Sequence, residues 1–232
     1  MIDFHTHILP AVDDGAANRD EALTLIEALK REGVKTAVCT PHFDPSRTSL
    51  QDFIMHRNRA FQELSTACIR LVAASETLLH DYLFHYADLS PLCIENTEYL
   101  LLEMPFLRKW DDSVYTMLSN LISDYNVIPI IAHIERYPAA KGRAIPGRLK
   151  AIGCLLQLNT SSLLDAGCRK RAIRLIKKGY IDLLGSDCHD KAVRPPVIIK
   201  ALQLIEEQAG RDYIRQLEEN GLKVLINIDI RN

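Results

Sequence analysis

Histidines and carboxylates recur along the chain in short motifs that could bind metal ions. The first is His5-Thr6-His7, in which residues i and i+2 of an extended chain point the same way, so both imidazoles can reach one ion. The pair alone is weak support, because an isolated buried histidine is usually just hydrogen-bonded. The other candidates are Asp13 or Asp14, His42, Glu76, Glu103, His133, Asp187 and His189.

The number of these candidates that occur together, rather than any single residue, supports a metal site. Five of the eight histidines belong to the set, although a carboxylate at the end of a strand is often only solvated and the Asp13-Asp14 pair could be an ordinary turn. Imidazole and carboxylate together suit ions such as Mn, Fe or Zn, and no Cys-x-x-Cys pair competes. Nine ligands are too many for one ion, so we expect two or three ions and at least one bridging carboxylate.

The candidates follow short apolar runs that resemble parallel strands buried on both faces. Seven such runs span residues 2–5, 36–40, 69–75, 99–103, 127–133, 154–159 and 181–185. Amphipathic helices are expected at residues 18–33, 50–67, 109–125, 165–178, 196–208 and 212–220, with a last short strand at residues 223–226. Asn18 is placed to cap the first helix, with Glu21 three residues on.

Repeated strand–helix units form either an open doubly wound sheet or a closed barrel. In a barrel the carboxyl ends of all strands converge on one mouth, whereas in an open sheet only those at the switch point share a site. Polar residues end nearly every predicted strand here, which favours the barrel. We therefore predict a single α/β domain spanning residues 1–232.

Bulk composition excludes several classes of protein. The chain of 232 residues has 28 basic and 30 acidic residues, which predicts neither nucleic-acid binding nor attraction to an anionic membrane. Its N-terminus does not resemble a signal peptide, and its apolar runs are too short to cross a bilayer. Six scattered cysteines are expected to be reduced thiols in a cytoplasmic protein.

Together these motifs resemble the polymerase-and-histidinol-phosphatase (PHP) superfamily. The matching segments are His5-Thr-His7, Leu-Pro-x-Val-Asp-Asp-Gly, Thr-Pro-His42, Ala-His133-Ile-Glu-Arg136-Tyr and Gly-Ser-Asp187-Cys-His189. More narrowly, they look like its bacterial protein-tyrosine phosphatase branch, associated with capsule and exopolysaccharide operons. The likeness extends to about Pro196, although Ala11 stands where the family usually has Gly.

The resemblance implies a distorted (β/α)7 TIM-like barrel with three metal ions, commonly manganese, with iron or zinc as alternatives. Carried over by position, the first ion takes His5, His7, Glu76 and Asp187; the second takes Glu76, Glu103 and His133; the third takes Asp14, His42 and His189. The choice between Asp13 and Asp14 stays open. Arg136 and Arg194 match basic positions of the family that face the phosphate.

The resemblance implies hydrolysis of phosphotyrosine by direct attack of a metal-bound hydroxide, on a tyrosine kinase that regulates capsular or exopolysaccharide synthesis. Two alternatives are a phosphatase for a small metabolite, like the histidinol-phosphatase relatives, and a non-catalytic, metal-stabilised module that binds the kinase. An open mouth would favour a peptide and a deep closed pocket a metabolite. A homo-oligomer is compatible with the sequence.

A second phosphatase signature is present in the chain. Cys168 and Arg174 have the Cys-x5-Arg spacing of cysteine-dependent tyrosine phosphatases, whose loop wraps the phosphate with backbone amides. The intervening residues are Arg-Lys-Arg-Ala-Ile, without glycine, in a predicted amphipathic helix. We therefore expect a helix here. His56, His80 and His85 are expected to be structural or solvent-facing.

Overall fold

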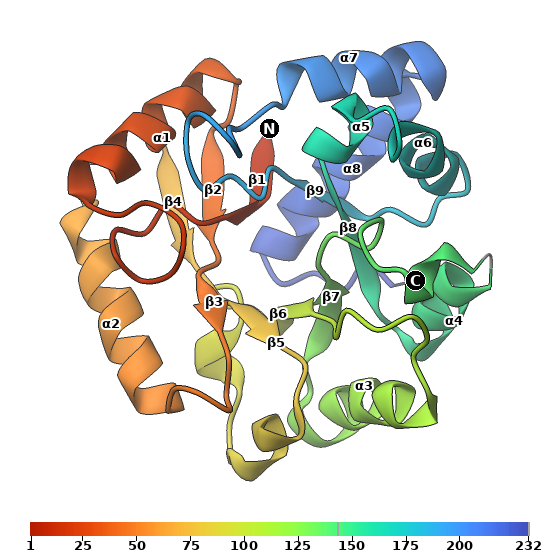
Figure 1. Cartoon of the computed structure of the whole chain (residues 1–232), viewed down its shortest axis with the longest axis horizontal. Helices are drawn as coiled ribbons and strands as arrows, with labels where there is room; N and C mark the ends of the chain where they lie inside the picture. Colours follow the sequence, from red (N-terminus) through yellow and green to blue (C-terminus); the bar gives the residue numbers. More distant parts are fainter. Residues whose placement is uncertain (143, 232) are drawn as a thin grey trace.

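The centre of the protein is a curled sheet of parallel strands (Figure 1). The computed structural model describes residues 1–142 and 144–231. The strands are β1 (Ile2–Thr6), β2 (Thr36–Cys39), β3 (His42–Phe43), β4 (Arg70–Ala73), β5 (Glu76–Leu78), β6 (Tyr99–Glu103), β7 (Ile128–Ile131), β8 (Leu155–Asn159) and β9 (Leu183–Gly185). They pair in two runs, β1-β2-β4 and β3-β5-β6-β7-β8-β9.

The two runs form one interrupted sheet. Only residues 40–41 separate β2 from β3, and only residues 74–75 separate β4 from β5. Across these breaks the amide of Ala74 donates to the carbonyl of Cys39 (3.0 Å) and that of Glu76 to the carbonyl of Pro41 (3.0 Å). Each pair is therefore one strand with a kink, and the seven predicted parallel strands are confirmed.

The first and last strands meet and close the barrel. The amide of Asp187 donates to the carbonyl of His5 (2.8 Å), and the amide of His7 donates to the carbonyl of Cys188 (3.0 Å). Gly185 makes this approach possible, because a Cβ there would lie 2.4 Å from the Cβ of His5. The prediction of a barrel is confirmed, with β9 beside β1 in Figure 1.

Helices surround the barrel (Figure 1). They are α1 (Arg19–Arg31), α2 (Leu50–Glu63), α3 (Asp112–Tyr125), α4 (Ile145–Ile152), α5 (Ser161–Leu164), α6 (Arg169–Lys177), α7 (Ile199–Gln208) and α8 (Arg211–Leu225), with short 3-10 turns η1 (Asp81–His85), η2 (Ser90–Leu92) and η3 (Ala139–Lys141). In α1, Asn18 accepts a hydrogen bond from the amide of Glu21 (3.0 Å), as the capping motif predicts. The helix buries Ala22, Leu25, Ile26 and Leu29 along one face, as the predicted amphipathic character requires.

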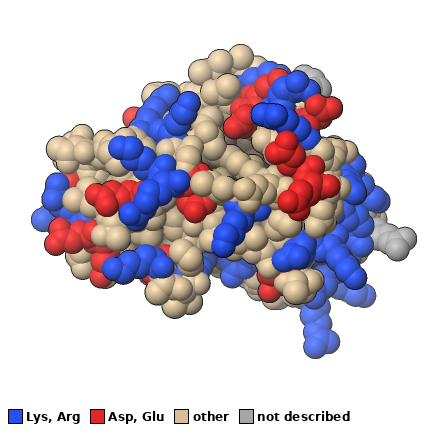
Figure 2. All heavy atoms as spheres, turned by 90° about the horizontal axis from the view of Figure 1, so that it is seen from above, with Lys and Arg blue, Asp and Glu red and all other residues tan. Residues whose placement is uncertain are grey.

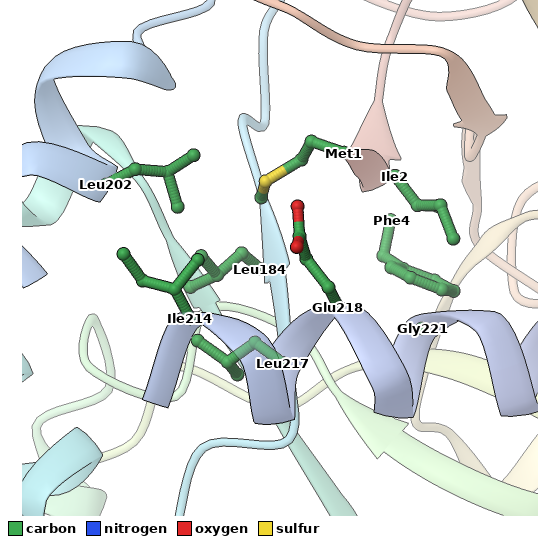
Figure 3. A pocket seen from close by; sticks show the side chains of 9 residues that line it. All are labelled: Met1, Ile2, Phe4, Leu184, Leu202, Ile214, Leu217, Glu218 and Gly221. Carbon is green, nitrogen blue, oxygen red and sulfur yellow. The ribbon is translucent and has the colours of Figure 1, made fainter. Parts of the chain in front are cut away.

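One predicted element was wrong, and two helices were not predicted. The predicted strand at residues 223–226 lies mostly within α8, and the missed helices are α4 and α5. A short apolar run fits a buried helix face as well as a strand. Here Gly221 of α8 lies so near β1 that a Cβ would be 2.9 Å from the Phe4 ring. Figure 3 shows Gly221 of α8 beside Phe4, and Leu217 farther along the helix near Leu184, around a cavity of about 10 Å³, so the helix packs closely against the barrel.

The distribution of charged side chains on the surface agrees with the nearly equal numbers of basic and acidic residues. Basic and acidic side chains are interspersed over most of the face seen in Figure 2, as expected from a net charge of -2. Within residues 1–142 and 144–231, no helix has the length and apolar character needed to cross a membrane.

Candidate metal centre

Loops and strand ends at the mouth of the barrel bring nine candidate ligands together. His5 lies in β1, and the segment that follows carries His7 and Asp14. The others are His42 at β3, Glu76 at β5, Glu103 at the end of β6, His133 just past β7, and Asp187 and His189 just past β9. Residues from the first and last strands become neighbours because the barrel closes. The structure therefore assembles every side chain of the predicted set.

The deepest part of the cluster is buried. His5 Nε2 lies 3.0 Å from His7 Nε2 and 3.1 Å from Glu76 Oε2. His133 Nε2 lies 2.8 Å from Glu76 Oε1. Asp187 Oδ1 lies 3.6 Å from His5 Nε2 and 3.4 Å from His7 Nε2. So many ligand atoms within contact distance, shielded from water, make this part of the cluster a candidate cation site.

A more open part of the cluster continues toward solvent. Asp14 Oδ1 lies 3.6 Å from His42 Nε2 and 3.3 Å from His189 Nε2. His42 Nδ1 lies 3.1 Å from Glu76 Oε2 and 3.9 Å from Glu103 Oε2. Asp14 is about two-thirds exposed, whereas Glu76 is fully buried. The cluster thus runs from the barrel interior to its rim.

The candidate ligands form four overlapping sets, and within each set the ligand atoms all lie within 4.8 Å of one another. The sets are His7-Asp14-His42-His189, His5-His7-Asp187, His5-Glu76-His133 and His42-Glu76-Glu103. Glu76 belongs to two sets, as do His5, His7 and His42. Shared ligands in adjoining sets are typical of a multinuclear centre.

Three histidines are held with Nε2 facing the cluster. His7 Nδ1 lies 2.6 Å from Asp13 Oδ2, and His189 Nδ1 lies 3.0 Å from the carbonyl of Asp187. His5 Nδ1 lies 3.3 Å from Gln157 Oε1. Each partner is an acceptor, so Nδ1 keeps its proton and Nε2 is the atom that would bind a metal.

The cluster also leaves polar atoms unsatisfied, as a site for ions should. Among the described residues, Glu76 Oε2, His133 Nδ1 and His189 Nε2 are buried side-chain atoms without a hydrogen-bond partner. Uncompensated burial of a carboxylate oxygen is costly, and a bound cation removes that cost. The residues present therefore fit divalent metal ions.

Electrostatics keep the inner carboxylates charged. Burial acts to raise the pKa of Glu76, but the charge of His5 and a hydrogen bond from His133 bring that pKa well below its usual value. At the rim, burial and then the charge of Glu76 raise the pKa of Glu103 to about 7. Burial, with the charges of His7 and Arg194, lowers the pKa of His189 to about 4, which favours its neutral, ligating form.

Asp13 and Asp14 have different places. Asp13 contacts His7 Nδ1 and accepts a hydrogen bond from the amide of His42 (3.0 Å). Asp14 faces Nε2 of His42 and of His189. The sharp turn needs Gly15, because a Cβ there would lie 2.0 Å from the carbonyl oxygen of His7. The geometry therefore favours Asp14 as the ligand and Asp13 as a support.

Both candidate arginines lie at the rim of the cluster. Arg136 Nη1 is 3.0 Å from Asp187 Oδ2, and Arg194 Nη2 is 2.7 Å from Asp187 Oδ1. Their side chains are 42% and 35% exposed. An open groove of about 370 Å³ begins at these arginines and continues past Leu164 and Val193. The arrangement presents two guanidinium groups to an anion entering beside the cluster.

Sequence reasoning missed the layer that supports the ligands from β8. Gln157 Oε1 accepts from the amide of His133 (2.7 Å), and Gln157 Nε2 donates to Asn159 Oδ1 (3.0 Å). Asn159 Nδ2 donates to Asp187 Oδ2 (2.7 Å). The signal was present as Leu-Leu-Gln-Leu-Asn, in which two polar residues with i, i+2 spacing interrupt a buried strand. The motif did not stand out because the side-chain amides of Gln and Asn are not preferred metal ligands.

The Cys-x5-Arg spacing has no phosphate loop. Residues Arg169–Lys177 form α6, with Cys168 at its N-cap position. Burial, together with a hydrogen bond and the charge of Asp165, raises the pKa of the Cys168 thiol. The predicted helix is confirmed. His56 and His85 are exposed and His80 caps η1, so the expectation for these three is also confirmed.

Known proteins provide an independent comparison. The family model described as "Capsular polysaccharide synthesis, CpsB/CapC" matches residues 1–226. Tyrosine-protein phosphatase CpsB of Streptococcus agalactiae serotype V is 30% identical, over 98% of this chain and 99% of the relative. Tyrosine-protein phosphatase YwqE of Bacillus subtilis is 27% identical, over 98% of this chain and 92% of the relative.

A solved structure agrees. It belongs to a study of YwqE from Bacillus subtilis and CpsB from Streptococcus pneumoniae, described as unique metal-dependent tyrosine phosphatases. It matches with a TM-score of 0.87 and 25% identity, covering 98% of this chain and 95% of the other. Sequence, fold and the convergence of candidate ligands therefore agree, and the chain belongs to the CpsB/CapC family of capsular polysaccharide synthesis.

Proposed function

We propose that the protein is a metal-dependent protein-tyrosine phosphatase, in which residues 1–232 form one PHP-type domain. The observation that carries the proposal is the buried convergence of His5, His7, Glu76, His133 and Asp187 beside Arg136. The names of the relatives, tyrosine-protein phosphatase CpsB and YwqE, support the same reaction.

The proposed cofactor is three divalent ions, with manganese as the first choice. The ligand sets are His5, His7, Glu76 and Asp187 for one ion, Glu76, Glu103 and His133 for another, and Asp14, His42 and His189 for the third. The neighbouring ligand atoms support the third set and, through His5-His7-Asp187, most of the first, whereas His133 and Glu103 join Glu76 in two separate groups, which is compatible with Glu76 as the bridge. When bound, such ions lower the pKa of water and neutralise charge on phosphoryl oxygens.

The chain's own residues orient the ester and stabilise its transition state. We propose that Arg136 and Arg194 turn from Asp187 to grip the phosphoryl oxygens, which a planar guanidinium can do with two hydrogen bonds. We propose that water attacks phosphorus directly, and the absence of a phosphate loop at Cys168 argues against a cysteinyl-phosphate intermediate. The tyrosine hydroxyl has a pKa of about 10, so phenolate can leave with only modest help from a proton donor.

The shape of the site favours a protein substrate over a metabolite. The groove that begins at Arg136 and Arg194 opens to solvent, and Val193 at its edge is 84% exposed. A polypeptide can lie in an open groove, whereas a small metabolite is usually held in a cavity that buries most of its surface. We propose a phosphotyrosine segment of a cytoplasmic tyrosine kinase as the substrate, in keeping with the capsular polysaccharide family.

A substrate panel tests this function. The manganese-loaded protein is assayed on a phosphotyrosine peptide, the matched phosphoserine peptide and histidinol phosphate. We expect the highest kcat/KM on phosphotyrosine and a loss of about 10²–10³-fold in Arg136→Lys. Cys168→Ser should keep its activity. Preferential turnover of histidinol phosphate would contradict the substrate proposal, and inactivity of Cys168→Ser would contradict the mechanism.

A further inference from the structure

An aromatic ring stands half-exposed at the rim of the metal centre. Phe106 follows β6, three residues beyond the candidate ligand Glu103, and is 50% exposed. Its ring centroid lies 6.1 Å from that of His133, and the guanidinium carbon of Arg136 lies 5.6 Å from it. A large apolar side chain is thus open to solvent beside both a candidate metal ligand and a candidate phosphate-binding arginine.

Buried aromatic residues hold this ring from behind. The Phe106 ring packs 4.8 Å from the ring of Tyr137, which is fully buried and packs 5.3 Å from Trp110. The hydroxyl of Tyr137 accepts a hydrogen bond from the amide of Met104 (2.9 Å). Phe106 is therefore the outer member of a packed row of rings, and Tyr137 ties that row to the start of the loop.

The backbone around Phe106 is also constrained. The amide of Leu107 donates to the carbonyl of Pro105 (2.8 Å), which makes Phe106 the central residue of a three-residue turn. The indole N–H of Trp110 donates to the same carbonyl (2.9 Å). A ring held by its turn and by Tyr137 loses little freedom when a ligand packs on it, so contact is gained at low entropic cost.

We infer that Phe106 is a specificity-determining residue that packs against the aryl ring of the phosphomonoester substrate. This inference rests on the proposed function and adds a basis for choosing phenyl over alkyl esters. A phosphate gripped by Arg136 places its ester group within reach of the neighbouring Phe106 ring. An offset or edge-to-face aromatic pair adds about three- to tenfold in affinity beyond simple burial.

The test compares variants on matched aryl and alkyl ligands. Phe106→Ala should lower kcat/KM on a phosphotyrosine peptide by about tenfold, mainly through KM, and change turnover of the matched phosphoserine peptide less than twofold. Phe106→Tyr should retain the activity, and Phe106→Leu should fall between. Each variant is compared with the unsubstituted protein on one ester, so intrinsic ester reactivity cancels.

A binding measurement provides a readout that does not need turnover. Calorimetry with the manganese-loaded protein should show phenylphosphonate binding about tenfold more weakly to Phe106→Ala, with methylphosphonate unchanged. Leu107→Ala is the matched control, because Leu107 is the adjacent residue and is 52% exposed. It should leave both ligands unaffected.

Two results would overturn the inference. One is an equal loss for aryl and alkyl ligands in Phe106→Ala, and the other is no loss for either. Failure of the proposed function has a different signature, namely that the unsubstituted protein hydrolyses none of the esters.

Discussion

At the scale of single residues, the ligands depend on neighbours that bind no metal. Gln157 is fully buried on β8 and contacts both His5 Nδ1 (3.3 Å) and the amide of His133 (2.7 Å). The amide N–H of His133 can only donate, so Gln157 presents its oxygen there, and His5 must donate to that same oxygen. One amide thereby sets the tautomer of one ligand and the backbone position of another.

Removal of this amide should weaken metal binding. Gln157→Leu leaves His5 without an acceptor at Nδ1, and loss of such a partner typically costs 10–100-fold in metal affinity. Calorimetric titration of Mn²⁺ into chelator-treated protein measures the change, with the exposed Gln51→Leu as control. Unfolding of both metal-free variants checks that they fold. A folded Gln157→Leu protein with unchanged Mn²⁺ affinity would refute the role assigned to Gln157.

Residue types and spacing were enough to predict which side chains gather, but not how adjacent residues divide the roles. Nothing in Asp13-Asp14 distinguishes the two carboxylates, because the choice depends on the turn that points Asp13 back at His7. Ala11 likewise stands where the family usually has Gly, and its φ of 56° lies in the left-handed region that Gly favours. Phe106 was missed because a single exposed aromatic has no sequence signature.

At the scale of elements, a partly buried ion pair fastens α4 to the barrel. Lys150 of α4 lies 2.7 Å from Asp182, the residue before β9, and Asp182 also accepts a hydrogen bond from the amide of Leu156 in β8 (2.8 Å). Burial raises the pKa of Asp182, and Lys150 partly counters that effect. The pair joins α4 to two strands whose ends reach the metal centre.

Breaking this pair should destabilise the protein in a pH-dependent way. Lys150→Met should lower the free energy of unfolding by about 2 kcal/mol at pH 7, less than for a fully buried pair because Lys150 is a quarter exposed. Without Lys150 the folded-state pKa of Asp182 rises further. The penalty is therefore largest at neutral pH and disappears once pH falls below the folded-state pKa of Asp182, where the folded protein holds the proton with or without Lys150.

Urea unfolding of chelator-treated protein at pH 7 and pH 4.5 measures the penalty, with the exposed Lys35→Met as control. A penalty for Lys150→Met that is equal at the two pH values would contradict the assignment to Asp182.

The fold was predictable from sequence where periodicity and strand-end chemistry agreed. The seven strand runs and the capped α1 follow directly from burial pattern and Asn18. The helix α4 was not found, because it is short and begins Ile-Pro without a capping side chain. The end of α8 was assigned to a strand, because only its packing beneath β1 distinguishes a buried helix turn from a strand.

At the scale of the whole molecule, barrel closure makes one site from residues spread between positions 5 and 189. Five histidines and four carboxylates from six of the seven strands or the loops that follow them meet at the mouth, and β8 supports them with amides. Ions bound there would connect strands that are distant in sequence. Metal binding should therefore be linked to stability as well as to activity.

The proposed metal dependence is tested most directly by measuring phosphatase activity against metal content in one preparation. Metal is removed with a chelator, Mn²⁺ is added back stepwise, and bound metal, hydrolysis of a phosphotyrosine peptide and Tm are measured at each step. A metal-dependent phosphatase should show no turnover without metal, recovery as about three ions bind per chain, and a parallel rise in Tm. Unchanged turnover in verified metal-free protein, or no turnover at full Mn²⁺ occupancy, would contradict the proposal.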